Sequence, residues 1–213
     1  MKKTILTALF STLLITASAQ TQRVRPLWSF GANLGLTYSS IDFSPKVQQS
    51  LRKGFSGGFT ARWMTDKSLG LQAELNITQR GWKENFEEQP QYSYDRLLTY
   101  LEIPFMTHIQ FNPFFINLGP QLAYLLGEST QDGLNGDSPN TNNEQHDLAV
   151  ERNFDYGITA GLGYELRTGI GRFILEGRYY IALSNIYNSS KQDPFPKSAN
   201  HTISAKLTYL FDL

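Results

Sequence analysis

The sequence predicts an all-β protein: an eight-stranded antiparallel up-and-down transmembrane β-barrel of the outer-membrane type. Three observations favour this fold class. Eight segments alternate apolar and polar residues at period two, the connections between them are alternately short and long, and the chain begins with a segment typical of exported proteins. The length of 213 residues suits one barrel.

The first 19 residues have the pattern of a cleaved signal peptide. Lys2 and Lys3 precede an apolar run that ends in Ala17-Ser18-Ala19, a small-x-small cleavage pattern. A transmembrane anchor is the alternative, but the run is short. We therefore expect export, removal of residues 1–19, and a single outer-membrane barrel domain over 20–213. The later chain has no apolar run of the roughly 18 residues that a membrane helix needs, so any crossing of a membrane must use strands.

The expected strands follow one another with the same alternation. The first repeats Trp, Phe, Ala, Leu, Leu and Tyr at every second position, the second Phe, Gly, Phe, Ala and Trp, the third Leu, Leu, Ala, Leu and Ile, and the fourth Leu, Ile, Phe, Thr and Ile. The fifth repeats Ile, Leu, Pro, Leu and Tyr, the sixth Phe, Tyr, Ile, Ala, Leu and Tyr, and the last two are similar. In chain order they are residues 28–38, 55–63, 69–80, 100–109, 116–124, 154–165, 172–183 and 202–211.

The connections alternate in length. Those after the second, fourth and sixth strands are short, at 65–68, 112–113 and 167–171. In an antiparallel barrel this places every short turn at one end and every long loop at the other, which is the arrangement of outer-membrane barrels with their short periplasmic turns. The long loops are expected at 39–53, 82–96, 128–152 and 184–199.

The charges indicate which face is the inside. The polar face of the strands carries four acids and four bases, whereas the apolar face carries almost no charge and has aromatic residues toward both ends. A lipocalin-like periplasmic carrier would have the reverse arrangement, with an apolar cup. We expect the charges to neutralise one another in a filled lumen, too narrow for a porin. These structural lumen charges are Arg62, Glu74, Arg80, Glu102, Glu165, Glu176, Arg178 and Lys206.

Composition argues against several other functions. The net charge is zero, so nucleic acid is not an expected partner, and the absence of cysteine excludes a lipid-attachment Cys, disulfides and thiolate metal sites. His108, His146 and His201 have neither metal-ligand nor triad spacing. We expect no metal, no cofactor and no catalytic residues. The alternative is a rim-active enzyme that modifies lipid or protein with a Ser-His-acid set at the outer edge.

Four phrases resemble the PorT-like family of small bacterial outer-membrane β-barrels. They are YLEIPF at 100–105, GPQLAYLL at 119–126, GLGYEL at 161–166 and LTYLF at 207–211, in the order and spacing of that family. The resemblance extends from about residue 28 to the end, and it implies the fold and the outer-membrane location rather than a chemistry. The ending Phe211-Asp212-Leu213 departs from the terminal aromatic residue that is common among such barrels.

The expected function is that of a non-porin barrel with a binding or an envelope and secretion accessory role located in its long outer loops. Expected partners are outer-membrane lipid, the barrel-insertion machinery, and envelope or surface proteins, with the barrel itself monomeric. The second long loop mixes aromatic and acidic residues, a composition that suits a protein interface as well as a membrane anchor. The candidate binding residues are Trp82, Phe86, Tyr92 and Tyr94.

Overall fold

The protein is an eight-stranded barrel. The computed structural model describes residues 27–44, 49–65, 68–84, 94–132, 150, 152–187 and 197–213. Each strand pairs antiparallel with its neighbours in sequence, and β1 also pairs with β8, which closes the barrel. The strands are β1 (Leu27–Ser44), β2 (Gln49–Met64), β3 (Leu69–Glu84), β4 (Tyr94–Phe111), β5 (Phe114–Asp132), β6 (Phe154–Thr168), β7 (Gly171–Ala182) and β8 (Lys197–Asp212).

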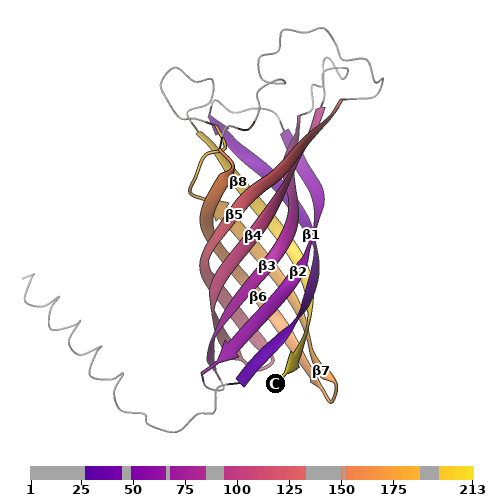
Figure 1. Cartoon of the computed structure of the whole chain (residues 1–213), viewed down its shortest axis with the longest axis vertical. Helices are drawn as coiled ribbons and strands as arrows, with labels where there is room; N and C mark the ends of the chain where they lie inside the picture. Colours follow the sequence, from indigo (N-terminus) through magenta and orange to yellow (C-terminus); the bar gives the residue numbers. More distant parts are fainter. Residues whose placement is uncertain are drawn as a thin grey trace, which may run out of the picture.

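The two ends of the barrel differ, as the alternation of connections predicted. The turns that join β4 to β5 and β6 to β7 lie at the lower end in Figure 1, with the facing ends of β2 and β3 and the C-terminus, and the opposite ends of the strands lie at the upper end. This arrangement confirms the predicted fold class. Among the described residues, no helix has the length and apolar character needed to cross a membrane.

The wall is apolar outside and polar inside over most of its height. From Phe154 to Leu166 of β6 the residues alternate strictly between exposed and buried, with the large apolar ones exposed. Leu162, Leu175 and Leu207 project outward from three neighbouring strands, whereas the inward positions beside them hold polar residues or glycine, with Ile174 as the apolar exception. A wall of this kind is stable when hydrocarbon surrounds it, because the outward leucines then avoid water.

The strands are longer than the alternation predicted. They contain between 12 and 19 residues, whereas about 9–11 tilted residues cross the hydrocarbon layer. The predicted loops at 39–53, 82–96, 128–152 and 184–199 were too wide, because each range overlaps a paired strand. Most of the first range lies in β1 and β2, and part of each other range lies in strands that end or begin at Glu84, Tyr94, Asp132 and Lys197.

The reason for this error is visible in β1. Below Ser39, Leu34 and Leu36 face outward; above it, Ile41 and Phe43 are buried inside the barrel and Asp42 faces outward. The pairing of β1 with β8 continues without a break through this region, so the backbone keeps its register while the chemistry of the two faces reverses. The period-two pattern therefore continues, but with opposite polarity, as expected where the surroundings change from hydrocarbon to water.

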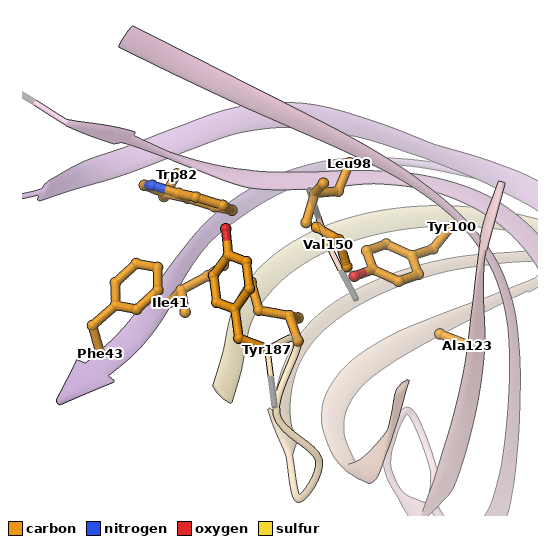
Figure 2. Close-up of a cluster of buried hydrophobic side chains, with 9 residues drawn as sticks. Ile41, Phe43, Trp82, Leu98, Tyr100, Ala123, Val150 and Tyr187 are labelled. Atoms are coloured by element: carbon orange, nitrogen blue, oxygen red, sulfur yellow. The ribbon is translucent and has the colours of Figure 1, made fainter. Parts of the chain in front are cut away.

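The upper end of the barrel has an apolar interior. Figure 2 shows side chains from several strands pointing toward one another there, with the ring of Phe43 5.5 Å from that of Trp82. Tyr187 stacks on Phe43 from the connection after β7. The buried members of this upper cluster are Ile41, Phe43, Trp82, Leu98, Tyr100, Ala123, Val150, Ile186 and Tyr187.

Irregularities in the ladder occur near the lower edge of the upper cluster. The register shifts between Leu51 and Ser56 in β2 and between Thr99 and Tyr100 in β4. In β3, Gly81 has a φ of 145°, and a Cβ at this position would lie 1.8 Å from the carbonyl oxygen of Arg96. Glycine is therefore required there, and the next residue, Trp82, keeps the inward parity of Thr78 and Arg80.

The height at which the two faces of β1 exchange polarity predicts where the outer wall tolerates a charged side chain. Leu207 and Leu51 are similarly exposed, at 59% and 56%, but Leu207 lies in the middle of the apolar wall and Leu51 lies beside the upper cluster. Leu207→Arg should lower the free energy of unfolding in lipid by about 2–4 kcal/mol, and Leu51→Arg by about 1 kcal/mol or less. Denaturant titration of the two variants in lipid vesicles measures the difference. Equal losses in the free energy of unfolding would contradict a polarity reversal between the heights of Leu207 and Leu51.

Candidate functional site

The interior of the barrel is built around charged side chains. All eight lumen charges predicted from the sequence are buried. Arg172 and Asp155 are also buried inside; they were not among the predicted charges, although their positions share the parity of their inward-facing neighbours. The interior charges form three layers, which are described here from the short-turn end upward.

The lowest layer joins Arg62 of β2 to Glu165 of β6. A guanidinium nitrogen of Arg62 lies 2.6 Å from a carboxylate oxygen of Glu165, and Arg172 lies 3.5 Å from the other oxygen. Arg172 also donates to Asp212 at 2.8 Å. Because β2 and β6 lie far apart in the strand order, the Arg62–Glu165 pair crosses the barrel, whereas Arg172 links the adjacent strands β6, β7 and β8.

The middle layer has the most dense set of charge-assisted hydrogen bonds. Arg178 donates to both oxygens of Glu74, at 2.7 and 3.0 Å, and to both oxygens of Glu176, at 2.9 and 3.1 Å. Lys206 donates to Glu74 at 2.6 Å, and the amides of Gln72 and Asn76 donate to the same carboxylate. Fully partnered pairs of this kind offset the cost of removing both charges from water.

The third layer, near the upper cluster, centres on Arg80. Its guanidinium pairs with Glu102 and, at 3.1 Å, with Asp155, and it lies 4.2 Å from the ring centroid of Tyr180. Asn200 and Ser184 also donate to Asp155. The layer therefore ties β3, β4, β6 and β8 together at one height.

Amides and small residues complete the packing. His108 contacts Asn117 through Nδ1 at 2.7 Å and Gln110 through Nε2 at 2.8 Å, so it is a hydrogen-bonded interior residue. A Cβ at Gly161 would lie 2.1 Å from Oε1 of Glu176. An inward glycine is therefore needed opposite the large charged side chains.

The filled interior leaves little free space. A cavity of about 20 Å³ lies between the middle and third layers, with Arg80, Glu102, Arg178, Tyr180 and Lys206 among its lining residues. This is room for about one water molecule. The interior therefore has the geometry of a polar core and not of a solute pathway.

The predicted binding residues of the second long loop have different outcomes. Trp82 was predicted in a loop, but it lies in β3 and is almost completely buried. It packs against Phe43, and the guanidinium of Arg96 lies 5.7 Å from its ring centroid. Its assignment as an exposed binding residue is wrong, because the reversed alternation turns it inward. Tyr94 begins β4, but its side chain is not among the described parts of the structure. Phe86, Tyr92 and the predicted signal peptide lie outside the described residues.

The outer rim was the expected location of catalytic groups in the alternative hypothesis. His201 faces outward on β8, and its Nδ1 lies 3.0 Å from the hydroxyl of Tyr179. In the part of the chain that the structure describes, no group of three His, Cys, Asp or Glu residues could hold a metal ion. His146, the remaining histidine, lies outside that part.

The fold and the apolar outer wall define a class of protein, the small outer-membrane β-barrels. Residues 18–188 match the model of the family described as outer membrane protein beta-barrel domain, and the chain belongs to this family. It is a small eight-stranded outer-membrane β-barrel protein. A search of curated protein sequences finds no match.

Solved structures of other small barrels are similar. Neisserial surface protein A (NspA) is 15% identical, with 86% of this chain and 97% of that chain covered and a TM-score of 0.45. The attachment invasion locus protein Ail of Yersinia pestis is 12% identical, with 86% and 98% covered and a TM-score of 0.43. Outer membrane protein AlkL is 8% identical, with 92% and 95% covered and a TM-score of 0.42.

The middle layer predicts a large effect of removing one buried charge. Arg178→Leu leaves Glu74 and Glu176 short of their main partner, so the free energy of unfolding should fall by about 3–5 kcal/mol. Arg167 also pairs with a carboxylate, but its side chain is 50% exposed, and Arg167→Leu should cost about 1 kcal/mol or less. Unfolding titrations of both variants in lipid vesicles measure the contrast. Equal, small effects would mean that the middle layer contributes little to stability.

The small interior cavity predicts very low conductance. Planar-bilayer recordings of the purified barrel should show no stable large pores, because the three layers of paired side chains occupy the lumen. Reproducible, long-lived conductance steps from pure protein would contradict this picture of a filled interior.

Proposed function

We propose that the protein is a non-transporting barrel that presents its outer end to a surface or envelope partner, in a binding or secretion accessory role. The observation that carries this proposal is the combination of a filled interior with strands that extend beyond the apolar wall. A filled lumen leaves the ends of the barrel as the sites for interaction. Rigid scaffolds commonly bind through the connections that they hold in place.

The upper cluster supports this role because it stiffens the end that would meet a partner. Trp82, Phe43 and Tyr187 fill the interior at the point where the wall no longer contacts hydrocarbon. Arg96 of β4 pairs with Glu128 of the neighbouring β5 at 2.9 Å, and Arg52 of β2 pairs with Asp95 of β4, past β3. The connections that follow would therefore start from fixed positions, which lowers the entropy lost when they bind.

The proposal does not include catalysis. His201 interacts with Tyr179, a neutral hydroxyl group, where a hydrolytic triad would hold its histidine with a carboxylate. We further propose that the protein belongs to the narrower PorT-like family, because four sequence phrases resemble that family. We expect outer-membrane lipid and the barrel-insertion machinery as general partners, a monomeric barrel, and cleavage after residue 19.

Loop replacement tests the proposal. Residues 85–93 between β3 and β4 can be replaced by a short Gly/Ser turn, and the barrel should still fold because the cost of loop closure depends weakly on length. A pull-down from detergent-solubilised membranes should then recover less of the partner than native protein does. The matched control replaces Gly169-Ile170, in the short turn at the opposite end, with Asn-Gly.

The two variants separate binding from folding. Both should keep the heat-modifiable gel migration of a closed barrel, and only the variant lacking 85–93 should lose partner recovery. Full recovery by both folded variants would contradict a binding role for this connection, and the same comparison can then be made for 133–149.

A further inference from the structure

The outer wall has a polar belt at the height where β1 reverses its polarity. Lys53 of β2 lies opposite Tyr38 of β1, and Ser40 of β1 lies opposite His201 of β8. Tyr179 of β7 is joined to His201 by a hydrogen bond. All five residues project outward, and together they form what we call the outer belt, which extends over four adjacent strands.

The outer belt is rich in hydrogen-bond donors and carries a cation. The ammonium nitrogen of Lys53 lies 6.0 Å from the ring centroid of Tyr38, and among the described residues no carboxylate pairs with it. When the Tyr179 hydroxyl donates to Nδ1 of His201, Nε2 carries the ring proton and can donate to a ligand. Lysine, imidazole and hydroxyl donors in two successive outward rows suit the oxygen atoms of a phosphate.

Directly below the outer belt, the apolar wall is hollowed. The row beneath Lys53 and Tyr38 contains Phe55 and Leu36, and these residues border a hollow of about 390 Å³. The hollow forms because Ala205 on β8 lies opposite Gly177 on β7, so two adjacent outward positions lack large side chains. The other apolar residues around it are Leu34, Leu175 and Leu207.

A hollow in this position has a restricted choice of occupants. It is lined by leucine, phenylalanine and alanine side chains at a depth where the wall faces hydrocarbon, so water would find few polar partners there. A hydrocarbon chain fills such a space and restores the dispersion contacts of the lining atoms. Lys53, Tyr38 and Tyr179 lie in the next outward row, beside Ile203, and Ser40 and His201 lie in the row above that, at the level of the lipid headgroups.

We propose that the outer belt and the hollow form one binding site for an outer-leaflet lipid with a phosphate-bearing headgroup. The phosphate contacts Lys53, with His201 and Ser40 as hydrogen-bond donors, and one acyl chain lies in the hollow beside Ala205. The cation selects a phosphate over a neutral headgroup, and the hollow selects a lipid over free phosphate. The outer leaflet follows because the outer belt lies toward the Ser44 end of β1 and the Lys197 end of β8, the end opposite the short turns.

Native mass spectrometry of the full chain in detergent micelles tests this site. The probes are phosphatidic acid, diacylglycerol with the same acyl chains, and inorganic phosphate. We expect phosphatidic acid to bind more tightly than diacylglycerol, and inorganic phosphate not to compete with it. Lys53→Gln should weaken phosphatidic acid roughly fivefold and leave diacylglycerol unchanged, whereas Ala205→Leu should weaken both lipids by filling the hollow.

Two matched variants control for charge and size. Lys83→Gln removes another exposed lysine on the neighbouring strand, and Ala73→Leu enlarges an outward alanine that does not line this hollow; neither should change the preference for phosphatidic acid. Equal binding of the two lipids, equal effects of Lys53→Gln and Lys83→Gln, or unchanged binding in Ala205→Leu would overturn the proposal.

Two other occupants of the site would give different results. Competition by inorganic phosphate would indicate a bare anion site, and loss of a dimer peak in Ala205→Leu would indicate an interface between two copies. Either result also overturns the proposal.

Discussion

The buried ion pairs are the interaction on which the rest of the structure depends. Hydrocarbon around the wall requires apolar side chains to face outward, and the alternation of a strand then sends the polar ones inside. Charges held away from water are tolerable only when each has partners, and Arg178 satisfies this condition by bonding two carboxylates at once. Since Arg178 lies on β7 and Glu74 on β3, the same bonds fix how distant strands face each other. Three layers of paired charges occupy the lumen that results.

The same eight strands meet two different surroundings along their length. Where the outside is hydrocarbon, the interior is ionic; toward the long connections, the interior changes to the apolar cluster around Trp82 and Phe43. A continuous ladder between β1 and β8 carries this change without a break in register. The barrel is therefore a membrane anchor in one part and resembles a water-soluble barrel with an apolar core in the other. The outer belt of Lys53, Tyr38, Ser40, His201 and Tyr179 lies where the two parts meet.

Most of the fold could be predicted from the sequence because period two identifies a strand and the connection lengths identify its neighbours. The eight predicted lumen charges could be found in the same way, since their parity is that of the inward face. The ends of the strands could not be predicted by searching for outward apolar residues, because Ile41 and Phe43 follow the reversed pattern. Trp82 was misplaced for the same reason, because it keeps the inward parity of Thr78 and Arg80 where the interior has become apolar. The pairing of particular charges, such as Arg80 with Asp155, depends on the position of strands across the barrel, which a single strand does not reveal.

The position of the reversal can be measured along one strand. The native chain has no cysteine, so single cysteines at positions 34, 36, 40, 42 and 44 can each carry a nitroxide label on the barrel in lipid vesicles. Paramagnetic relaxation by oxygen, which concentrates in hydrocarbon, is compared with relaxation by a water-soluble nickel complex. The account predicts that oxygen dominates at 34 and 36 and that nickel dominates at 42 and 44, with the change near 40. Oxygen dominance through position 44, or nickel dominance already at 34, would contradict a barrel whose interior changes from ionic to apolar at the membrane surface.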